Sequence, residues 1–348
     1  MEPGLVERYE RTLRRAGDFL RGRQRPDGSV EGADTIWGYY SQPLAFLGTG
    51  SPADWRSANR CLDHVRDAFL DGDSLRIEPL PLVGDLYPYP YLIRGASIWG
   101  RFDLALPLTR TLLQFQDACG GFRYRRGDAR LMDPAVTPHG GVALLLTGHV
   151  SEAEQAGRLL VRLHEAQPDP SNRYLTVWDT SLNGPLDDYT GVEDVAWGGG
   201  SRLVRDNVAG ENAYWDIGFS MAFLCALSRA TGDSQYVHVA RDLFDLFRGY
   251  RGFDEHVWKT PWGTAALYQA TGAEDVREVA LRMADEIVST QQEDGGFFLG
   301  AQSSYLDEAN EGWSYGFANY DELRANVPIL LDTAAQMAHY LAQVRAVL

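Results

Sequence analysis

Residues 271–297 read TGAEDVREVALRMADEIVSTQQEDGGF, and this stretch combines a turn, one helix and a second turn. Apolar residues recur every three or four positions between Val276 and Ile287, which places them on one face of a helix. A glycine precedes the helix, and a polar turn with two glycines follows it. The pattern predicts an amphipathic helix with a turn at each end.

The turn at Gly272 recurs along the chain. An apolar helix, a glycine and an amphipathic helix follow one another in LAFLGTGSPADW, SIWGRFDLALPL, LLLTGHVSEAEQ, LSRATGDSQYVH and LYQATGAEDVRE, with turn glycines Gly50, Gly100, Gly148, Gly232 and Gly272. Most of these glycines are 40 to 50 residues apart, a period typical of proteins built from helical hairpins. The one long interval, from Gly148 to Gly232, indicates an insertion at about residues 168–210.

Helices on the two sides of each glycine differ in character. Those before it are apolar on nearly every face, which predicts burial, whereas those after it have one apolar stripe and many charges. The sequence therefore predicts outer helices at about 5–22, 52–70, 103–116, 151–166, 234–248 and 274–291. Inner helices are predicted at about 35–47, 89–99, 139–147, 212–230, 258–270 and 323–345.

Because outer and inner helices alternate throughout, we predict an all-α (α/α)6 toroid, a ring of six helical hairpins formed by residues 1–348 as a single domain. In such a ring the last inner helix closes against the first, so that no terminal repeat stays exposed. An open array of helical repeats is the alternative.

A second recurrence lies where an outer helix leads into the next inner one. It reads QRPDGSV at Gln24, QFQDACGGF at Gln116, QPDPSN at Gln167 and QQEDGGF at Gln292. Asp and Gly favour a turn with left-handed backbone, and the Gln amide can hydrogen-bond the end of a neighbouring helix. These segments are expected to link the hairpins.

The link sequences resemble a known family. Gln-x-x-Asp-Gly followed by Ser-Val or Gly-Phe resembles the QW repeats of the terpenoid cyclase and protein prenyltransferase toroids, with Val30, Phe122 and Phe297 in place of Trp. Six-hairpin glycosidases and sugar epimerases share the (α/α)6 ring and also use Asp-Gly turns. The fold does not choose between these chemistries.

Composition excludes several other classes of function. The net charge of -16 disfavours binding to nucleic acid and to anionic membranes. Cys61, Cys119 and Cys225 give neither a disulfide framework nor a Cys-x-x-Cys metal motif. The charged N-terminus lacks a signal sequence and no apolar run is long enough to span a bilayer, so a cytoplasmic location is expected. We expect no cofactor, no metal and a small-molecule substrate.

Chemistry is expected in the long loops that connect outer to inner helices and at the starts of the inner helices. Aromatic residues are dense there, and the predicted substrate-binding set is Trp37, Tyr39, Tyr89, Glu211, Tyr214, Trp215, Trp258, Trp262 and Trp313. Carboxyl groups beside large rings can be general acids because desolvation raises their pKa, and the ring faces stabilise cations.

The predicted catalytic residues are Asp34, Asp133, His139, Asp216 and Lys259. Asp34-Thr35 resembles the Asp-Thr end of the Asp-x-Asp-Asp-Thr acid motif of class II terpene cyclases, although Gly32 and Ala33 replace the upstream acids. A helix N-cap is the other interpretation of Asp34.

Similar alternatives stay open for the other candidates. Asp133 and His139 form either an acid–base pair or a capping Asp beside an exposed His. Asp216 either faces the ring cavity with Trp215 or makes a buried structural hydrogen bond. Lys259, the only lysine against 31 arginines, either supplies a titratable amine or stands there by chance. The acidic segment LDDYTGVED lacks the spacing of a magnesium–diphosphate motif.

These features favour an acid-initiated cyclase or isomerase of an apolar, isoprenoid-like molecule, with Asp34 or Asp216 as the acid. The alternative is a carbohydrate enzyme, a hydrolase or an epimerase, in which two carboxylates act across a sugar ring. An aromatic cavity with one acid would indicate the cyclase, and converging polar side chains would indicate the sugar enzyme. A non-catalytic toroid that binds a partner would instead expose an apolar patch.

Overall fold

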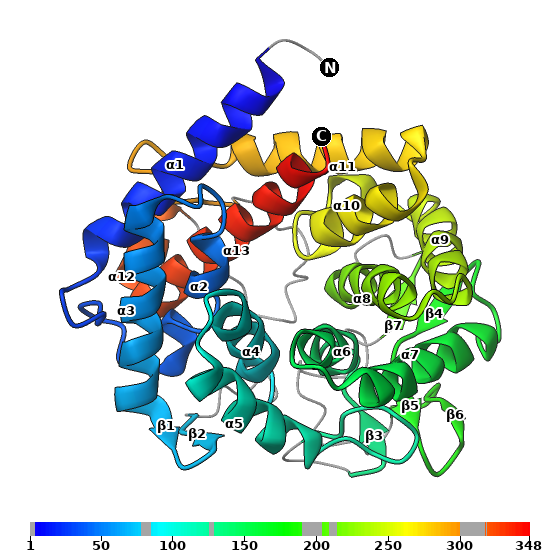
Figure 1. Ribbon diagram of the computed structural model, residues 1–348. Helices are drawn as coiled ribbons and strands as arrows, with labels where there is room; N and C mark the ends of the chain where they lie inside the picture. The colour runs from blue at the N-terminus through cyan, green and yellow to red at the C-terminus, as the bar shows by residue number, and fades with distance from the viewer. Residues whose placement is uncertain are drawn as a thin grey trace.

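The computed structural model describes residues 4–77, 85–124, 129–189, 204–208, 214–299, 317 and 319–348, and within them the helices form a closed double ring (Figure 1). The outer helices are α1 (Leu5–Arg23), α3 (Pro52–Phe69), α5 (Phe102–Leu113), α7 (Val150–Glu165), α9 (Gln235–Arg248) and α11 (Glu274–Ser289). The inner ones are α2 (Gln42–Ala45), α4 (Pro88–Ile98), α6 (Val136–Leu146), α8 (Trp215–Thr231), α10 (Thr260–Thr271) and α13 (Val327–Ala346). The (α/α)6 prediction is confirmed.

The hydrophobic pattern explains the two rings. In α11 the buried residues include Val276, Val279, Ala280, Met283 and Ile287, the stripe that the sequence predicts. In α6, by contrast, every residue from Val136 to Leu144 is buried. A striped helix can cover a core from one side, whereas an apolar helix must be enclosed on all sides.

Two predicted inner helices are wrong in their extent. The first, predicted at 35–47, is a 3-10 turn at Ile36–Gly38 followed by the short α2. Pro43 fits the break, because proline has no N–H to donate and is tolerated in the first turn of α2 but not in the interior of a longer helix. The last, predicted at 323–345, is split into α12 (Tyr320–Ala325) and α13 at Asn326, whose side chain caps α13.

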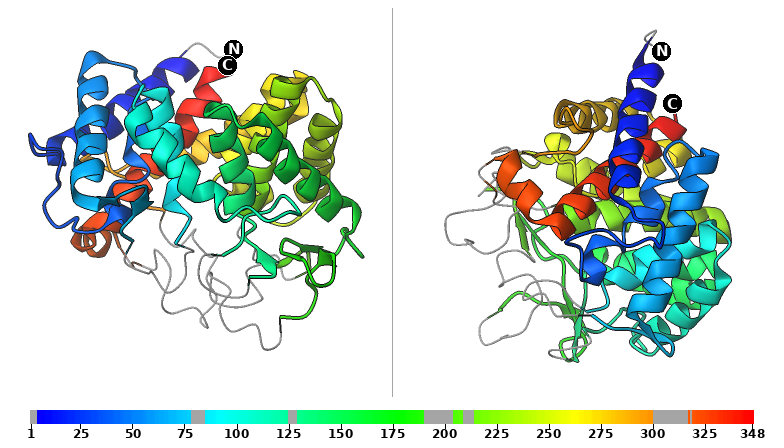
Figure 2. Two further views of the ribbon diagram at one scale, coloured as in Figure 1. Left: turned by 60° about the horizontal axis from the view of Figure 1, so that its bottom comes forward. Right: turned by 90° about the vertical axis from the view of Figure 1, so that its left-hand side faces the viewer.

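Short turns join each inner helix to the next outer one on one face of the ring. All five predicted turn glycines, from Gly50 to Gly272, have left-handed backbone with φ between 61° and 84°. The described parts of the long connections, among them the strands β3 (Leu131–Met132) to β7 (Val204–Asp206), lie on the opposite face, as the two views in Figure 2 show. We call these the short-turn face and the long-loop face.

Three of the four predicted links between hairpins bind the next outer helix in the same way, through a hydrogen bond from a Gln side chain that we call the Gln clasp. The side-chain amide of Gln24 donates to the carbonyl of Ser57 in α3, and that of Gln116 donates to Glu152 in α7. In the third link the clasp is made by Gln291, which donates to Thr12 of α1, so the expected residue Gln292 is off by one. This last clasp joins the final outer helix to the first.

The fourth predicted link differs. Gln167 bonds back to Leu163 of the preceding helix α7 and forward to Leu175, not to a neighbouring outer helix, and QPDPSN has no glycine for the turn. Its loop carries the predicted insertion, of which the described part contains β4 (Arg173–Leu175), β5 (Trp178–Asp179), β6 (Gly184–Pro185) and β7 (Val204–Asp206). Strands β4 and β7 pair with each other, while β5 lies between β6 and β3 (Leu131–Met132). A further hairpin is formed by β1 (Leu70–Asp71) and β2 (Ser74–Leu75).

The ring closes through α13, which packs against α10 on one side and α2 on the other, and is covered by α1. None of the described helices is long and apolar enough to cross a membrane.

Candidate active site

Polar side chains line one face of two otherwise apolar inner helices. On α13 they are Asp332, Gln336, His339 and Tyr340, spaced by four, three and one residues; on α4 and the residue before it they are Tyr87, Tyr91 and Arg94. All are buried. Both helices run from the long-loop face toward the short-turn face, so these residues form three layers. The upper layer, nearest the long-loop face, contains Tyr87 and Asp332, the middle layer Tyr91, Gln336 and Tyr340, and the lower layer Arg94 and His339. Seven residues of helix, or about 10 Å, separate the upper layer from the lower one.

Asp332 is the acid of the upper layer. Ser41 donates to its Oδ1 over 2.7 Å, and the amide of Gln336 donates to its Oδ2 over 2.7 Å. Burial raises the pKa of the Asp332 carboxyl, while these hydrogen bonds and the charge of Lys259 act in the opposite direction. The hydrogen bonds from Ser41 and Gln336 therefore favour the ionised form of Asp332, and the charge of Lys259 adds to their effect whenever its amine is protonated.

The amine of Lys259 lies near Asp332 and is surrounded by three aromatic rings. Its Nζ is 4.8 Å from the centre of the Trp258 ring and 5.8 Å from the rings of Tyr87 and Phe219. Among the described residues it makes no ion pair, and burial lowers the pKa of its amine to about 7, with the Asp332 charge opposing that shift. At neutral pH this lysine is close to half protonated, as a general acid or base requires.

The backbone at Lys259 is held in a strained conformation. Its φ is +65°, a region that residues with a Cβ rarely adopt. The N–H of Thr260 reaches back to the carbonyl of Trp258 over 2.7 Å, and Gly218 of α8 allows the close approach, because a Cβ there would lie 2.4 Å from the Lys259 carbonyl carbon. Such strain persists where surrounding structure fixes it, often at functional sites.

Gln336 organises the middle layer. Its amide donates to Tyr40 and to Asp332, while its carbonyl oxygen accepts from Tyr91 over 3.1 Å and from Tyr340 over 2.6 Å. Burial raises the pKa of both Tyr91 and Tyr340 well above its usual range, so both hydroxyls keep their protons.

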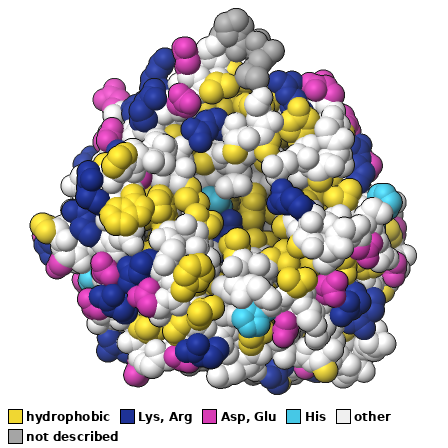
Figure 3. Space-filling view, in the orientation of Figure 1, with side chains coloured by type: hydrophobic (Ala, Val, Ile, Leu, Met, Phe, Trp, Pro, Cys, Tyr) yellow, Lys and Arg dark blue, Asp and Glu magenta, His cyan; other side chains and the backbone are white. Residues whose placement is uncertain are grey.

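Arg94 occupies the lower layer between two histidines. Its guanidinium lies 2.7 Å from Nε2 of His139 and 3.1 Å from Nε2 of His339, and it stacks 4.0 Å from the centre of the Trp262 ring. Burial and the Arg94 charge hold the pKa of both histidines well below 6.5, so both are neutral and accept hydrogen bonds at Nε2. In Figure 3 the short-turn face is hollowed at the centre, where hydrophobic, histidine and basic side chains are visible.

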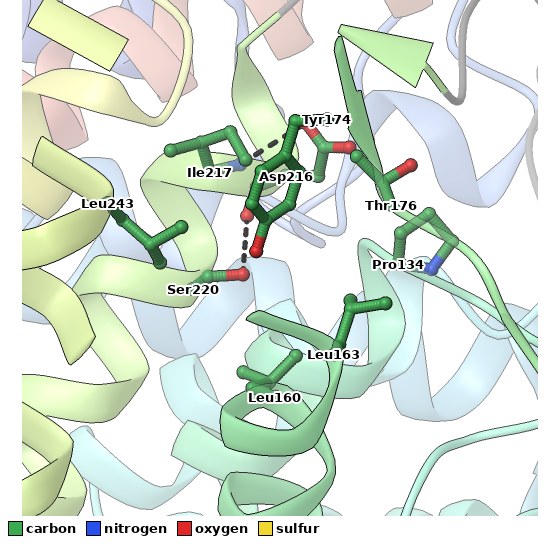
Figure 4. Close-up of a pocket in the computed structure, with 9 residues that line it drawn as sticks. All are labelled: Pro134, Leu160, Leu163, Tyr174, Thr176, Asp216, Ile217, Ser220 and Leu243. Carbon is green, nitrogen blue, oxygen red and sulfur yellow. Dashed lines mark hydrogen bonds between the residues drawn. The ribbon is translucent and has the colours of Figure 1, made fainter. Parts of the chain in front are cut away.

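Asp216 faces the outer helices, not the ring centre. It forms a fully buried ion pair with Arg205 of β7, at 2.8 Å and 3.2 Å, which ties the insertion to α8. Figure 4 shows it beside Ser220 and Ile217 in a small cleft bounded by Leu160 and Leu243 of α7 and α9. The cleft measures about 20 Å³, enough for about one water molecule.

The other predicted acids also lie away from the central layers. Asp133 accepts from the backbone N–H groups of Ala135 and Val136 at the start of α6, and burial raises the pKa of its carboxyl to about 6. Its predicted partner His139 bonds Arg94 instead. Asp34 is exposed, and the 3-10 turn that follows it begins from Thr35 without a side-chain cap.

The predicted substrate-binding residues divide into two groups. Trp258 and Trp262 contact Lys259 and Arg94, and Trp37 packs against Tyr40. The hydroxyls of Tyr39, Tyr89 and Tyr214 bond the backbone of surrounding loops, at Ala33, Leu75 and Arg251 respectively, and Trp215 packs near Arg205. Glu211 and Trp313 lie outside the described residues.

The sequence interpretation therefore missed Asp332, Gln336, His339 and Arg94. A signal for them exists: polar residues at positions i, i+4 and i+7 interrupt inner helices that are otherwise apolar, and an apolar helix that keeps a polar stripe must direct it at an internal site. Among the described residues, no group of three or more His, Cys, Asp or Glu side chains is placed to hold a metal ion.

Comparison with known proteins supports the fold. No protein-family model and no curated protein matches the sequence. The type II terpene cyclase MstE from Scytonema matches with a TM-score of 0.56 at 12% identity, over 99% of both chains. A D-mannose isomerase matches with 0.58 at 12%, over 92% of this chain and 97% of its own. The α-1,6-mannanase GH76A of Salegentibacter sp. HEL1_6 matches with 0.58 at 11%, over 96% and 99%.

These three structures are enzymes that share the (α/α)6 ring and perform different chemistry. At such low identity the likeness shows the fold alone, so the choice of function rests on the side chains of the central layers.

Proposed function

We propose that this chain is a cofactor-independent isomerase that moves a proton on the carbon next to a carbonyl group in a polar, hydroxylated small molecule. The observation that supports it best is Lys259, a buried amine with a pKa of about 7 whose nearby acid is Asp332. A base with this pKa is neutral and charged in comparable amounts at neutral pH, so it can take a proton and return it.

In the proposed reaction the neutral amine of Lys259 removes the proton from the carbon. The electrons of the broken C–H bond form a C=C bond, and the carbonyl π electrons move to oxygen to give an enediolate. A hydroxyl proton then passes between the two oxygens, and the Lys259 ammonium protonates the neighbouring carbon. The Asp332 carboxylate, which stays ionised, stabilises the ammonium, and the ammonium stabilises the enediolate.

A carbocation would be placed less favourably in the same site. The ring faces of Trp258, Tyr87 and Phe219, which would stabilise it, already face the amine of Lys259. Two unit positive charges about 6 Å apart repel by about 3 kcal/mol at an effective dielectric constant of 20. The hydroxyl and amide groups around Gln336 also make the middle layer polar, which is less suited to an apolar substrate. These points favour the sugar-type isomerase over the isoprenoid cyclase.

The cyclase is kept as a second candidate because of one observation. Asp332-Thr333 repeats the Asp-Thr pair found at Asp34-Thr35, and here the Asp is buried among aromatic side chains. In that reaction the Asp332 carboxyl would protonate a C=C bond and the rings would stabilise the cation.

Turnover with two substrate panels tests the choice. Wild type and Lys259→Met are incubated with aldoses and ketoses in one panel and with polyprenyl compounds in the other, and products of unchanged mass are sought by chromatography and mass spectrometry. We expect isomers of a hydroxylated carbonyl compound with wild type alone. Cyclised polyprenyl products, lost in Asp332→Asn and kept in Lys259→Met, would replace the proposal by the second candidate.

A further inference from the structure

The lower layer contains a positive charge that no acid balances. Arg94 is 4% exposed, and among the described residues no carboxylate forms an ion pair with it. Its two side-chain hydrogen-bond partners are the neutral histidines His139 and His339. Burial lowers the pKa of the guanidinium to about 10, so Arg94 stays charged at neutral pH, whereas Lys259 can lose its proton.

Arg205 shows how this protein treats another buried arginine. Its side chain is 1% exposed and forms a bidentate pair with Asp216. Burying a charge is costly unless a partner of opposite charge accompanies it. The contrast between the two arginines indicates that Arg94 has a partner that is not part of the described chain.

Hydrogen-bond donors are also left over. A guanidinium has five N–H groups, and Arg94 uses two of them for His139 and His339. Its Nε is buried without a hydrogen-bond partner, and so are the Nδ1 atoms of both histidines, which carry the proton because Nε2 accepts. Trp262 covers one face of the guanidinium, and the unused N–H groups point outward along its edge, where an oxygen acceptor can meet them.

We propose that the lower layer binds an anionic oxygen group, a carboxylate or a phosphate, carried by the substrate, with Arg94 as its charge partner. This inference rests on the proposed function and narrows it, because the substrate becomes an acidic hydroxylated carbonyl compound such as a sugar acid or a sugar phosphate. Phe219 stacks on His139 with ring centres 4.6 Å apart and also borders Lys259. Phe219 therefore borders both the Arg94 layer and the Lys259 amine, and the proposed substrate would span these two groups.

Ligand-induced thermal stabilisation tests the inference with D-glucuronate, D-glucose 6-phosphate, D-glucose, acetate and inorganic phosphate as probes. We expect wild type to bind at least one of the two acidic sugars at least 100-fold more tightly than D-glucose, and Arg94→Met to lose that preference. Which acidic sugar binds tells a carboxylate from a phosphate. Equal binding of D-glucose and of both acidic sugars, or an unchanged preference in Arg94→Met, would overturn the inference.

The variants also report on the site without any ligand. Arg94→Met removes an unbalanced charge and is expected to raise the Tm, whereas the matched control Arg205→Met leaves Asp216 unpaired and is expected to lower it. A lower Tm in Arg94→Met would contradict the inference. Isomerisation of neutral sugars alone would refute the anion site and leave the proposed function standing. Acidic-sugar binding through Arg94 without isomer formation would refute the function and leave the anion site.

Discussion

At the scale of single residues, Lys259 is the one whose position the stability of the fold does not explain, because burying its amine lowers that stability. Its amine has a pKa of about 7 in the folded protein against 10.5 in a free lysine. Between pH 7 and 10.5 the unfolded chain therefore binds a proton that the folded chain does not, so the folded state gains stability as pH rises through this window. At pH 7 this lysine destabilises the fold, and we read that cost as the result of selection for function.

We therefore expect Lys259→Met to be more stable than wild type and inactive. The gain is about 4 kcal/mol at pH 7. Each tenfold change in proton affinity between a pKa of 10.5 and one of about 7 contributes about 1.4 kcal/mol, less a small amount for the amine that is still protonated in the folded state. Thermal unfolding measured from pH 6 to pH 10 checks it, because the advantage of the variant should shrink as pH approaches 10. A variant less stable than wild type at pH 7 would contradict this account.

Asp332 moderates the effect of burial on the pKa of that lysine. Its charge raises the pKa of Lys259, in opposition to burial. Because the neutral amine is the base, activity in wild type should rise with pH through about 7, and in Asp332→Asn the midpoint should move to lower pH. The kcat/KM profile of both proteins measures this directly. An unchanged midpoint with reduced activity would assign Asp332 a role in structure only.

At the scale of elements, the links between hairpins decide how closely the outer helices pack. Gly120 has φ +103°, and a Cβ there would lie 2.1 Å from the carbonyl oxygen of Gln155 in α7. Gly148 has a similar φ of +84° but no atom within 4 Å of such a Cβ. A comparison of the two positions therefore separates the cost of left-handed backbone, which both share, from the cost of a clash with α7, which only Gly120 has.

We expect Gly148→Ala to cost about 1 kcal/mol, from the left-handed backbone alone, and Gly120→Ala to cost at least about 3 kcal/mol because α7 must also move. Urea unfolding of both variants gives the comparison. Equal losses would show that the link does not hold α7 against α5.

The same elements show what the sequence could predict. The stripe on α11, the alternation of helix types and the turn glycines follow from local periodicity, so the ring and its order were predictable. The short α2 and the offset of the Gln291 clasp depend on proline geometry and on register, which a periodic pattern does not fix to one residue.

The candidate site was harder to predict for a physical reason. Tyr39 and Tyr40 are neighbours in sequence, yet Tyr39 bonds a loop and Tyr40 bonds Gln336 in the ring centre. Both residues lie between the 3-10 turn and α2, so which of them faces the centre depends on an irregular backbone that a periodic sequence pattern does not describe. Asp34 and Asp332 likewise share the same Asp-Thr pair, and burial alone separates them.

At the scale of the whole molecule, the helices at the two ends of the chain pack against each other as neighbouring helices elsewhere in the ring do. The helix α13 is covered by α1, and the start of α1 and the end of α13 lie close together on the same side in Figure 1. A circular permutant with the ends joined by a flexible linker and new ends at the exposed turn by Gly148 should keep one cooperative unfolding transition. Circular dichroism melts check it, and loss of cooperativity would show that the chain ends hold the ring together.

Solvent deuterium incorporation tests the central claim, that Lys259 moves a proton to and from carbon. Wild type and Lys259→Met are incubated in D2O with neutral and acidic sugars, and the carbon-bound hydrogens next to the carbonyl are followed by NMR. We predict that a substrate gains deuterium at that carbon with wild type and not with Lys259→Met. Exchange at the same rate in Lys259→Met, or an isomeric product formed by wild type without any deuterium, would contradict the account.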